Sequence, residues 1–210
     1  MARVYVETII DAPMDRLWAA TQDPRRHARW DVRFGRIDPG DGSFTYATSV
    51  LPGVEISGYG VPSGERRRPD GSGVSALRFG SDDRRSLIRD GSGYWRYEPT
   101  PSGIKFLTGY AYRPRWGRPG RVIDVVFGPL FGWATAWSFD RLRLWLERGV
   151  PPERARRHAV AEFVLRATLV VVAIVTGWWL LAVPAVLLPP HPLTPAARRC
   201  RRRPRKETAR

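Results

Sequence analysis

A small set of polar side chains could do acid–base chemistry or orient a ligand inside a folded domain. They are carboxylates, arginines and tyrosines near runs that we expect to be strands: Asp31, Glu55, Arg78, Tyr94, Arg96, Tyr110 and Tyr112. Burial shifts the pKa of a carboxyl or phenol group, and such shifted groups serve in general acid–base catalysis. The alternative for each residue is a cross-strand partner or a surface group. The pattern does not choose between them, so we assign no catalytic residue.

Other motifs that carry chemistry do not occur in the sequence. It contains no Ser-His-Asp set, no histidine or cysteine spacing typical of a metal site and no phosphate-binding glycine loop. His27 lies on an expected short helix, where we predict a surface or capping role. The single cysteine, Cys200, permits neither an intrachain disulfide nor a cysteine zinc cluster. We therefore expect no metal and no cofactor.

The elements that would position these residues follow from periodicity and turn signals. An alternating run over residues 4–10 predicts a strand, and Pro13 and Pro24 open two short helices that end near Trp30. Five further strands are predicted between glycine- and proline-rich turns, near residues 44–51, 54–61, 74–80, 92–98 and 104–112. A long helix over residues 121–147 ends before Gly149, with a kink predicted at Pro129. The first part of this helix is apolar almost all round, so it must be buried or in lipid.

This order of elements, together with several short motifs, resembles the SRPBCC superfamily (START, polyketide cyclase/dehydrase and lipid-transport proteins). The motifs lie in residues 4–13, 17–18, 21–24, 27–31, 92–97 and 133–145, and the resemblance covers about residues 3–148. It implies an α+β helix-grip fold, in which a curved antiparallel sheet wraps around a long C-terminal helix and leaves a hydrophobic cavity. Aromatic side chains supply large, rigid walls for such a cavity. The ligand-binding residues that we predict are Trp30, Trp95, Tyr110, Trp133 and Trp137.

Beyond this domain, residues 167–188 contain no charged side chain, and a run of this length fits one bilayer crossing. We expect a helix-grip domain over residues 1–150, a basic linker over 151–166, a transmembrane helix over 167–188 and a basic disordered tail over 189–210. Of the net charge of +15, residues 151–210 carry +9. We favour contact of the tail with anionic lipid over nucleic-acid binding, because no aromatic residues are interleaved with its arginines.

The flanking charges bear on which side of the membrane the domain lies. Residues 189–209 contain seven basic residues and residues 146–166 contain five arginines, and this difference favours a cytoplasmic tail. Against this, a folded domain is harder to export than a short tail, and the lack of disulfides fits a reducing compartment. We predict a single-pass membrane protein with its domain in the cytoplasm.

Three functions are compatible with these features. The first is membrane-tethered binding of a hydrophobic small molecule or lipid without chemistry. The second is an enzyme of the polyketide cyclase/dehydrase type, and the third is an interaction module whose cavity is filled by its own tryptophans. An open, apolar cavity would favour binding, a convergent buried ionisable pair would favour the enzyme, and a filled core would favour the module.

Overall fold

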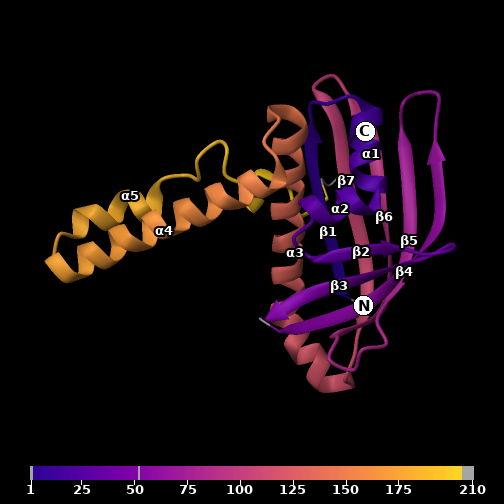
Figure 1. Ribbon diagram of the computed structural model, residues 1–210, viewed down its shortest axis with the longest axis horizontal. Coiled ribbons are helices and arrows are strands. Elements are labelled where there is room, and N and C mark those ends of the chain that lie inside the picture. The colour runs from indigo at the N-terminus through magenta and orange to yellow at the C-terminus, as the bar shows by residue number, and fades with distance from the viewer. Residues whose placement is uncertain (1, 52, 205–210) are drawn as a thin grey trace, which may run out of the picture.

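The computed structural model describes residues 2–51 and 53–204, which form one antiparallel sheet, helices packed against it and a helical hairpin that extends away (Figure 1). The sheet has seven strands in the order β1-β7-β6-β5-β4-β3-β2. The strands are β1 (Ala2–Ile10), β2 (Arg36–Pro39), β3 (Phe44–Leu51), β4 (Val54–Arg67), β5 (Gly73–Gly80), β6 (Ile88–Thr100) and β7 (Gly103–Pro114). All the strands predicted from alternation are confirmed. The short edge strand β2 was not predicted.

Strand alternation decides which side chains form the core. On β1, Val4, Val6 and Ile10 are buried, and Val6 pairs with Thr108 of β7. On β7, the even-numbered residues Phe106, Thr108, Tyr110 and Tyr112 are buried as well. Because the side-chain period of a strand is two, one face of the sheet carries this aromatic set and the other faces solvent.

Three helices pack against that face: α1 (Met14–Gln22), α2 (Pro24–Trp30) and α3 (Gly117–Arg148). The side chain of Asp23 accepts a hydrogen bond from the backbone N–H of Arg25 at 2.9 Å and caps α2. Gly149 ends α3 with φ of 63°, a conformation that favours glycine. The rings of Phe139 on α3 and Phe106 on β7 stack with centroids 4.5 Å apart. The fold is therefore the predicted α+β helix-grip fold.

The first half of α3 is buried on one side only. Gly132 lies against Val4 of the sheet, whereas Val122, Val126, Leu130 and Trp133 recur every three or four residues and are exposed. Of the two environments expected for this apolar helix, burial or lipid, the structure shows burial on its inner side alone. Pro129 lies inside α3 without ending it.

After α3 the chain forms a hairpin instead of the single transmembrane helix that we expected over residues 167–188. Helix α4 (Pro152–Thr176) runs away from the domain, Gly177 turns the chain with φ of 74°, and α5 (Ala182–Leu187) returns along α4 (Figure 1). A short 3₁₀ turn, Trp179–Leu181, connects them. By length and composition, α3 and α4 are each apolar enough to cross a membrane.

The segment after the hairpin packs on the domain instead of forming the expected disordered tail. Asp140 on α3 accepts hydrogen bonds from the backbone N–H of Ala196 at 2.8 Å and from Arg199 at 3.0 Å. Ala197 and Cys200 are buried in the main core, and Arg201 pairs with Glu7 through two backbone hydrogen bonds. The tail beyond residue 204 lies outside the described residues. Because residues 196–201 pack on the domain, both ends of the hairpin lie beside it, which differs from the predicted single crossing.

Candidate functional site: a cavity between the sheet and helix α3

A cavity of about 230 Å³ lies between the inner face of the sheet and the first half of α3. Most of its lining is aromatic or aliphatic and comes from β3–β7, the segment after α2, and α3. The aromatic and aliphatic lining residues are Phe34, Phe44, Tyr46, Ile56, Leu77, Phe79, Leu87, Ile88, Tyr94, Trp95, Tyr110, Phe127 and Phe131. The other polar ones are His27, Arg33, Thr48, Ser86 and Thr108, and Gly93 completes the wall.

Two glycines of β4 give this cavity its aromatic wall. A Cβ atom at Gly58 would lie 2.3 Å from the Tyr46 ring, and one at Gly60 would lie 2.1 Å from the Phe44 ring. Both distances are far shorter than any real contact. The rings of Phe44 and Tyr46 on β3 can therefore approach the β4 backbone closely, and together with Ile56 they line the cavity.

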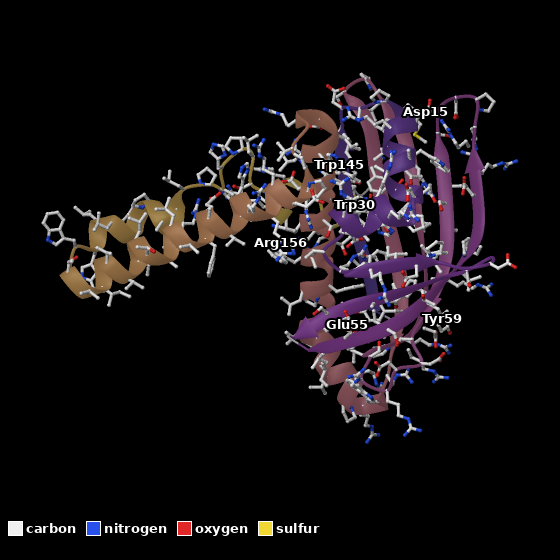
Figure 2. All side chains as sticks on the ribbon, viewed as in Figure 1. Asp15, Trp30, Glu55, Tyr59, Trp145 and Arg156 are labelled. Atoms are coloured by element: carbon white, nitrogen blue, oxygen red, sulfur yellow. The ribbon has the colours of Figure 1, made fainter. Side chains whose placement is uncertain are left out.

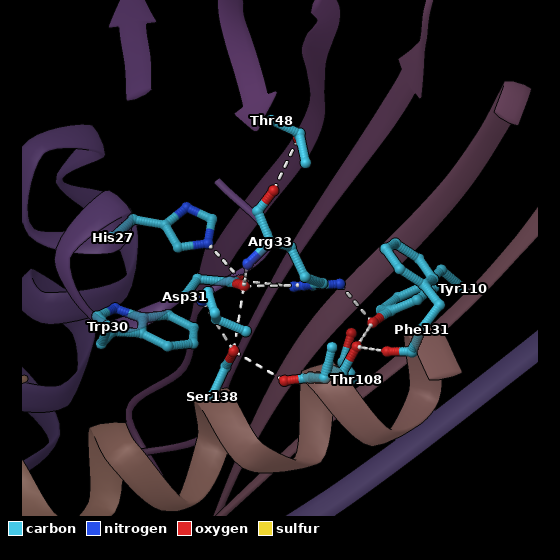
Figure 3. Close-up of polar contacts among 12 residues, drawn as sticks. His27, Trp30, Asp31, Arg33, Thr48, Thr108, Tyr110, Phe131 and Ser138 are labelled. Atoms are coloured by element: carbon cyan, nitrogen blue, oxygen red, sulfur yellow. Dashed lines mark hydrogen bonds and ion pairs between the residues drawn. The ribbon is translucent and has the colours of Figure 1, made fainter. Parts of the chain in front are cut away.

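A buried polar cluster forms one side of the cavity where α2 ends (Figure 3). The carboxylate of Asp31, the residue after α2, is fully buried. It accepts hydrogen bonds from the Nε2 of His27 at 3.1 Å, the Nε of Arg33 at 2.9 Å and the Oγ of Ser138 at 3.3 Å. His27 precedes Asp31 by four residues, so the helical turn of α2 brings the two side chains together. Ser138 comes from α3, and the cluster therefore joins α2 to the central helix.

Opposite charges outweigh the effect of burial in this cluster. Burial alone would raise the pKa of Asp31, but Arg33 and then His27 lower that pKa well below its usual range. Burial would likewise lower the pKa of Arg33, but the Asp31 carboxylate raises it. The pair is therefore ionised at neutral pH, and a carboxylate with such a low pKa is a weak proton acceptor.

Arg33 connects the ion pair to the cavity. Its Nη1 donates to the hydroxyl of Tyr110, which also shares a hydrogen bond with Thr135 of α3. The guanidinium lies 5.3 Å from the centroid of the Tyr110 ring and 5.2 Å from that of the Phe131 ring. Burial raises the pKa of Tyr110, so this phenol stays protonated at neutral pH. The cavity thus has apolar walls and one fixed positive group.

The predicted ligand-binding aromatics are divided between the cavity and other places. Trp95 and Tyr110 line it. Trp30 is fully buried nearby, its ring 4.9 Å from that of His27, and its Nε1 donates to the carbonyl of Ala20. Trp133 is about half exposed on the outer side of α3, and Trp137 packs under Arg141. For Trp30, Trp133 and Trp137 the prediction of a cavity wall is corrected, because Phe127 and Phe131 are the residues that α3 presents to the cavity.

The predicted polar candidates also separate by face. Tyr94 borders the cavity, and its ring lies 5.5 Å from the guanidinium of Arg96. Glu55, Arg78 and Arg96 are exposed. The hydroxyl of Tyr112 donates to Asp124 at 2.7 Å.

Two polar residues of the site were not expected there. His27 is buried in the cavity wall and not at the surface as we predicted, and Arg33 was not among the candidates at all. The spacing of His27 and Asp31 on a helix, with Arg33 two residues further on, is a signal that could have identified the cluster. Within residues 2–51 and 53–204, no group of three or more histidine, cysteine, aspartate or glutamate side chains could hold a metal ion.

Comparisons with known proteins agree with this architecture. No protein-family model matches the chain. It is 44% identical over 165 residues to YndG, an uncharacterized membrane protein of Bacillus subtilis (strain 168); the match covers 75% of this chain and 62% of that protein. The chain therefore spans less than two thirds of that relative's length.

Solved structures share the fold at low sequence identity. A protein from Arthrobacter aurescens matches with a TM-score of 0.54 and 15% identity, over 72% of this chain and 89% of that one. Protein CV1439 from Chromobacterium violaceum matches with a TM-score of 0.52 and 18% identity, over 70% and 97% of the two chains. The chain is thus a helix-grip protein by its fold. Its relative in B. subtilis is a membrane protein, which supports association of this chain with a membrane.

Proposed function

We propose that this chain is a membrane-tethered member of the SRPBCC superfamily that binds a hydrophobic small molecule or lipid in the cavity. The observation that carries the proposal is an open cavity with apolar walls and a single buried, ion-paired arginine at its side. Ligand pockets typically combine such walls with a few polar groups that orient the ligand. The cavity is not filled by the tryptophans of α3, which weighs against an interaction module with a vestigial cavity.

The size of the cavity limits the ligand. An engineered cavity of about 150 Å³ accommodates benzene, so one of about 230 Å³ has room for a somewhat larger group. It is smaller than most pockets for drug-sized ligands, which begin at about 300 Å³. The occupant is therefore a compact apolar molecule, or one end of a longer lipid.

Arg33 indicates what the ligand carries besides apolar surface. An arginine has five N–H groups. Three of those of Arg33 bind Asp31 and Tyr110 within the described residues. The remaining two can donate to a carbonyl, phenol or carboxylate oxygen in a cavity that offers few other donors. We therefore expect a hydrophobic ligand with one such oxygen.

The test uses the full chain in detergent with 2-naphthol, a bicyclic phenol, as the probe. A ligand that binds the folded state alone raises its unfolding temperature. We expect this rise in the wild type and its loss in Ile56→Trp or Leu77→Trp, where an indole fills the cavity. Val61→Trp, on the outer side of the same strand as Ile56, should behave as the wild type. An equal rise in all four proteins would place the probe outside the cavity and contradict the proposal.

A specific observation supports an enzyme as the second candidate. The imidazole of His27 lines the cavity and is held by the Asp31 carboxylate, an arrangement that orients a histidine for proton transfer. A polyketide cyclase/dehydrase type of reaction would use such a group to move a proton and release water. The test is native mass spectrometry of the co-purified molecule. If the cavity is catalytic, His27→Asn should retain a molecule heavier by one water than that found in the wild type.

We also propose that the domain lies on the cytoplasmic side of the membrane. Exposed arginines lie at both ends of the hairpin: Arg154, Arg156 and Arg157 in the first turns of α4, and Arg198 and Arg202 after α5. Since both flanks lie beside the domain, the positive-inside tendency now points to one side for all of them. Figure 2 shows Arg156 where α4 leaves the domain.

A further inference from the structure

The hairpin of α4 and α5 presents an apolar surface that no other part of residues 2–51 and 53–204 covers. Fifteen large apolar side chains of residues 160–188 are exposed, and the sticks on the outer part of the hairpin are almost wholly carbon (Figure 2). Soluble monomers rarely expose contiguous apolar patches of this extent. The residues are Val160, Phe163, Val164, Leu165, Val171, Val172, Ile174, Val175, Trp178, Trp179, Leu180, Val183, Val186, Leu187 and Leu188.

Arg166 holds the hairpin closed near its base. Its guanidinium donates to the carbonyl oxygens of Ala185 at 2.8 Å, Leu188 at 2.9 Å and Pro189 at 3.1 Å. It also forms an ion pair with Glu162 at 2.6 Å, one turn earlier on α4. The carbonyl groups at the end of the returning segment are therefore satisfied by the outgoing helix. Glu162 thus neutralises the charge of Arg166, which lies among the exposed apolar residues of the hairpin.

The apolar part of the hairpin is shorter than a bilayer is thick. From Val160, the first of its exposed apolar residues, to Thr176, α4 rises about 24 Å at 1.5 Å per residue, and the chain then turns back at Gly177. The hydrocarbon core of a bilayer is about 30 Å thick. Folded in two, the apolar segment enters and leaves the hydrocarbon on one side without crossing it, whereas the same residues in one straight helix would be long enough to cross it.

The outer side of α3 continues the apolar surface beside the hairpin. Leu144 on α3 packs against Val150 and Ala155, at the point where α4 begins. Trp133 precedes Leu144 by eleven residues, about three helical turns, so both lie on one side of α3. The exposed stripe of Val122, Val126, Leu130 and Trp133 thus lies on the side from which the hairpin projects, and α4 runs across the direction of α3 (Figure 1).

We propose that the hairpin enters and leaves the bilayer through one leaflet and that the outer side of α3 rests on the membrane surface. The bilayer covers the apolar side chains of the hairpin and those of the α3 stripe together. The exposed arginines at the hairpin base, Arg154, Arg156 and Arg157, lie at the level of the headgroups, where anionic lipids attract them. The relative in B. subtilis is itself a membrane protein. This mode of attachment does not depend on what the cavity binds.

The experiment uses spin labels on the full chain, reconstituted in vesicles of phosphatidylcholine and phosphatidylglycerol. Cys200→Ala removes the native thiol, and labels are placed on cysteines at exposed positions. One variant pairs Val160→Cys with His191→Cys, since the backbone N–H of His191 donates to Glu162 at 3.1 Å. Single labels replace Leu180 at the tip, Val126 on α3 and Val61 on the outer side of β4. Circular dichroism and thermal unfolding check that each variant is folded.

The proposal expects three results together. The paired labels stay close in the membrane, whereas a single crossing would separate them by about 30 Å. The label at 180 collides with oxygen and not with a water-soluble nickel chelate, because it lies in hydrocarbon. The label at 126 is intermediate, and the control at 61 collides freely with the chelate.

Each of these three results, if it is not observed, contradicts one part of the proposal. Distant paired labels would show a single crossing. A tip label reached by the chelate would show that the hairpin does not enter the hydrocarbon. If the chelate reaches the label at 126 as freely as the label at 61, α3 does not lie on the membrane surface. The 2-naphthol test on the same protein is independent, so failure of the attachment and failure of the cavity proposal are distinguishable.

Discussion

At the scale of single residues, the buried Asp31–Arg33 pair is the feature on which the site depends. The Asp31 carboxylate accepts hydrogen bonds from His27 of α2, from Arg33 in the segment after α2 and from Ser138 of α3. Removing one partner of a buried pair leaves the other charge without compensation, which costs more than the pair contributes. The cavity wall and the packing of α2 therefore share one set of contacts.

Asp31→Asn should destabilise the domain strongly. The substitution leaves the Arg33 guanidinium buried without its counter-charge, and we expect a loss of about 3–5 kcal/mol in unfolding free energy. Denaturant unfolding of the full chain in detergent measures it. The matched control is Asp38→Asn, which removes an exposed ion pair with Arg36 and should cost at most about 1 kcal/mol. Equal losses in the two variants would contradict the importance of the buried pair.

The same pair predicts a pH dependence. The pKa of Asp31 is lowered in the folded state, so its contribution is complete above the pKa of an unfolded aspartate, about 4. The contribution is lost as the pH falls through the lower, folded-state pKa. The stability difference between the wild type and Asp31→Asn should therefore shrink as the pH is lowered below about 4. Unfolding curves across that range measure it, and a difference that grew at low pH would refute the assignment.

At the scale of elements, the hairpin depends on Arg166, because one guanidinium binds three carbonyl groups of the returning segment. Arg166→Gln removes most of these contacts and should loosen the return of α5. We expect the distance between labels at 160 and 191 to become longer and broader. Arg156→Gln, an exposed arginine of the same helix, should leave it unchanged. An unaltered distance in Arg166→Gln would mean that packing alone closes the hairpin.

The sequence predicts the regular elements well and the hairpin poorly. Alternation located the strands, and Pro24 and Gly149 located the ends of helices because these residues restrict the backbone locally. In contrast, 22 uncharged residues have the same composition in a straight helix and in a folded one. The difference lies in the left-handed turn at Gly177 and in contacts of Arg166 with carbonyls 19–23 residues later.

The sequence predicted only some of the residues that line the cavity. Trp95 and Tyr110 lie on strands whose alternation marks one face, and both line the cavity. Trp133 and Trp137 lie on a helix that is apolar on all sides, so no periodicity shows which side meets the sheet. Arg33 was missed because a lone arginine between helix and strand is usually at the surface; its burial depends on Asp31 and on tertiary packing.

At the scale of the whole molecule, the segment after the hairpin closes the domain. Ala197 and Cys200 enter the main core, and Arg201 pairs with Glu7 of the first strand. A domain that ends at residue 150 therefore lacks part of its core and leaves Asp140 without Arg199. This revises the expectation that residues 1–150 form the complete domain.

The reactivity of the Cys200 thiol measures how firmly residues 196–201 pack on the domain. Burial, followed by the charge of Asp140, raises the pKa of its thiol to about 12. Because the thiolate is the reactive form, Cys200 should react slowly with a disulfide reagent between about pH 7 and 9, where an ordinary thiol accelerates. Arg199→Ala should release the segment and speed the reaction, whereas Arg202→Ala, an exposed neighbour, should not. Fast labelling of the folded wild type would contradict the packing of this segment.

The side of the membrane on which the domain lies can be tested by proteolysis of the whole protein. If the domain is cytoplasmic, trypsin added outside spheroplasts should leave the chain intact, because the exposed arginines at 154–157 are inside. Digestion should begin once the membrane is permeabilised. Cleavage in intact spheroplasts would place the domain outside and contradict the positive-inside argument.

The closing contact between Glu7 and Arg201 also sets an order of events during protein synthesis. A ribosome makes the strands and α3 first, then the apolar hairpin, and last the residues that complete the core. Incomplete domains expose apolar surface and aggregate readily. The hairpin therefore emerges while the domain is still open, so a hairpin that lipid captures as it emerges would be captured before the domain has finished folding. A nascent chain that misses the membrane would carry an unfinished core and an uncovered hairpin at the same moment.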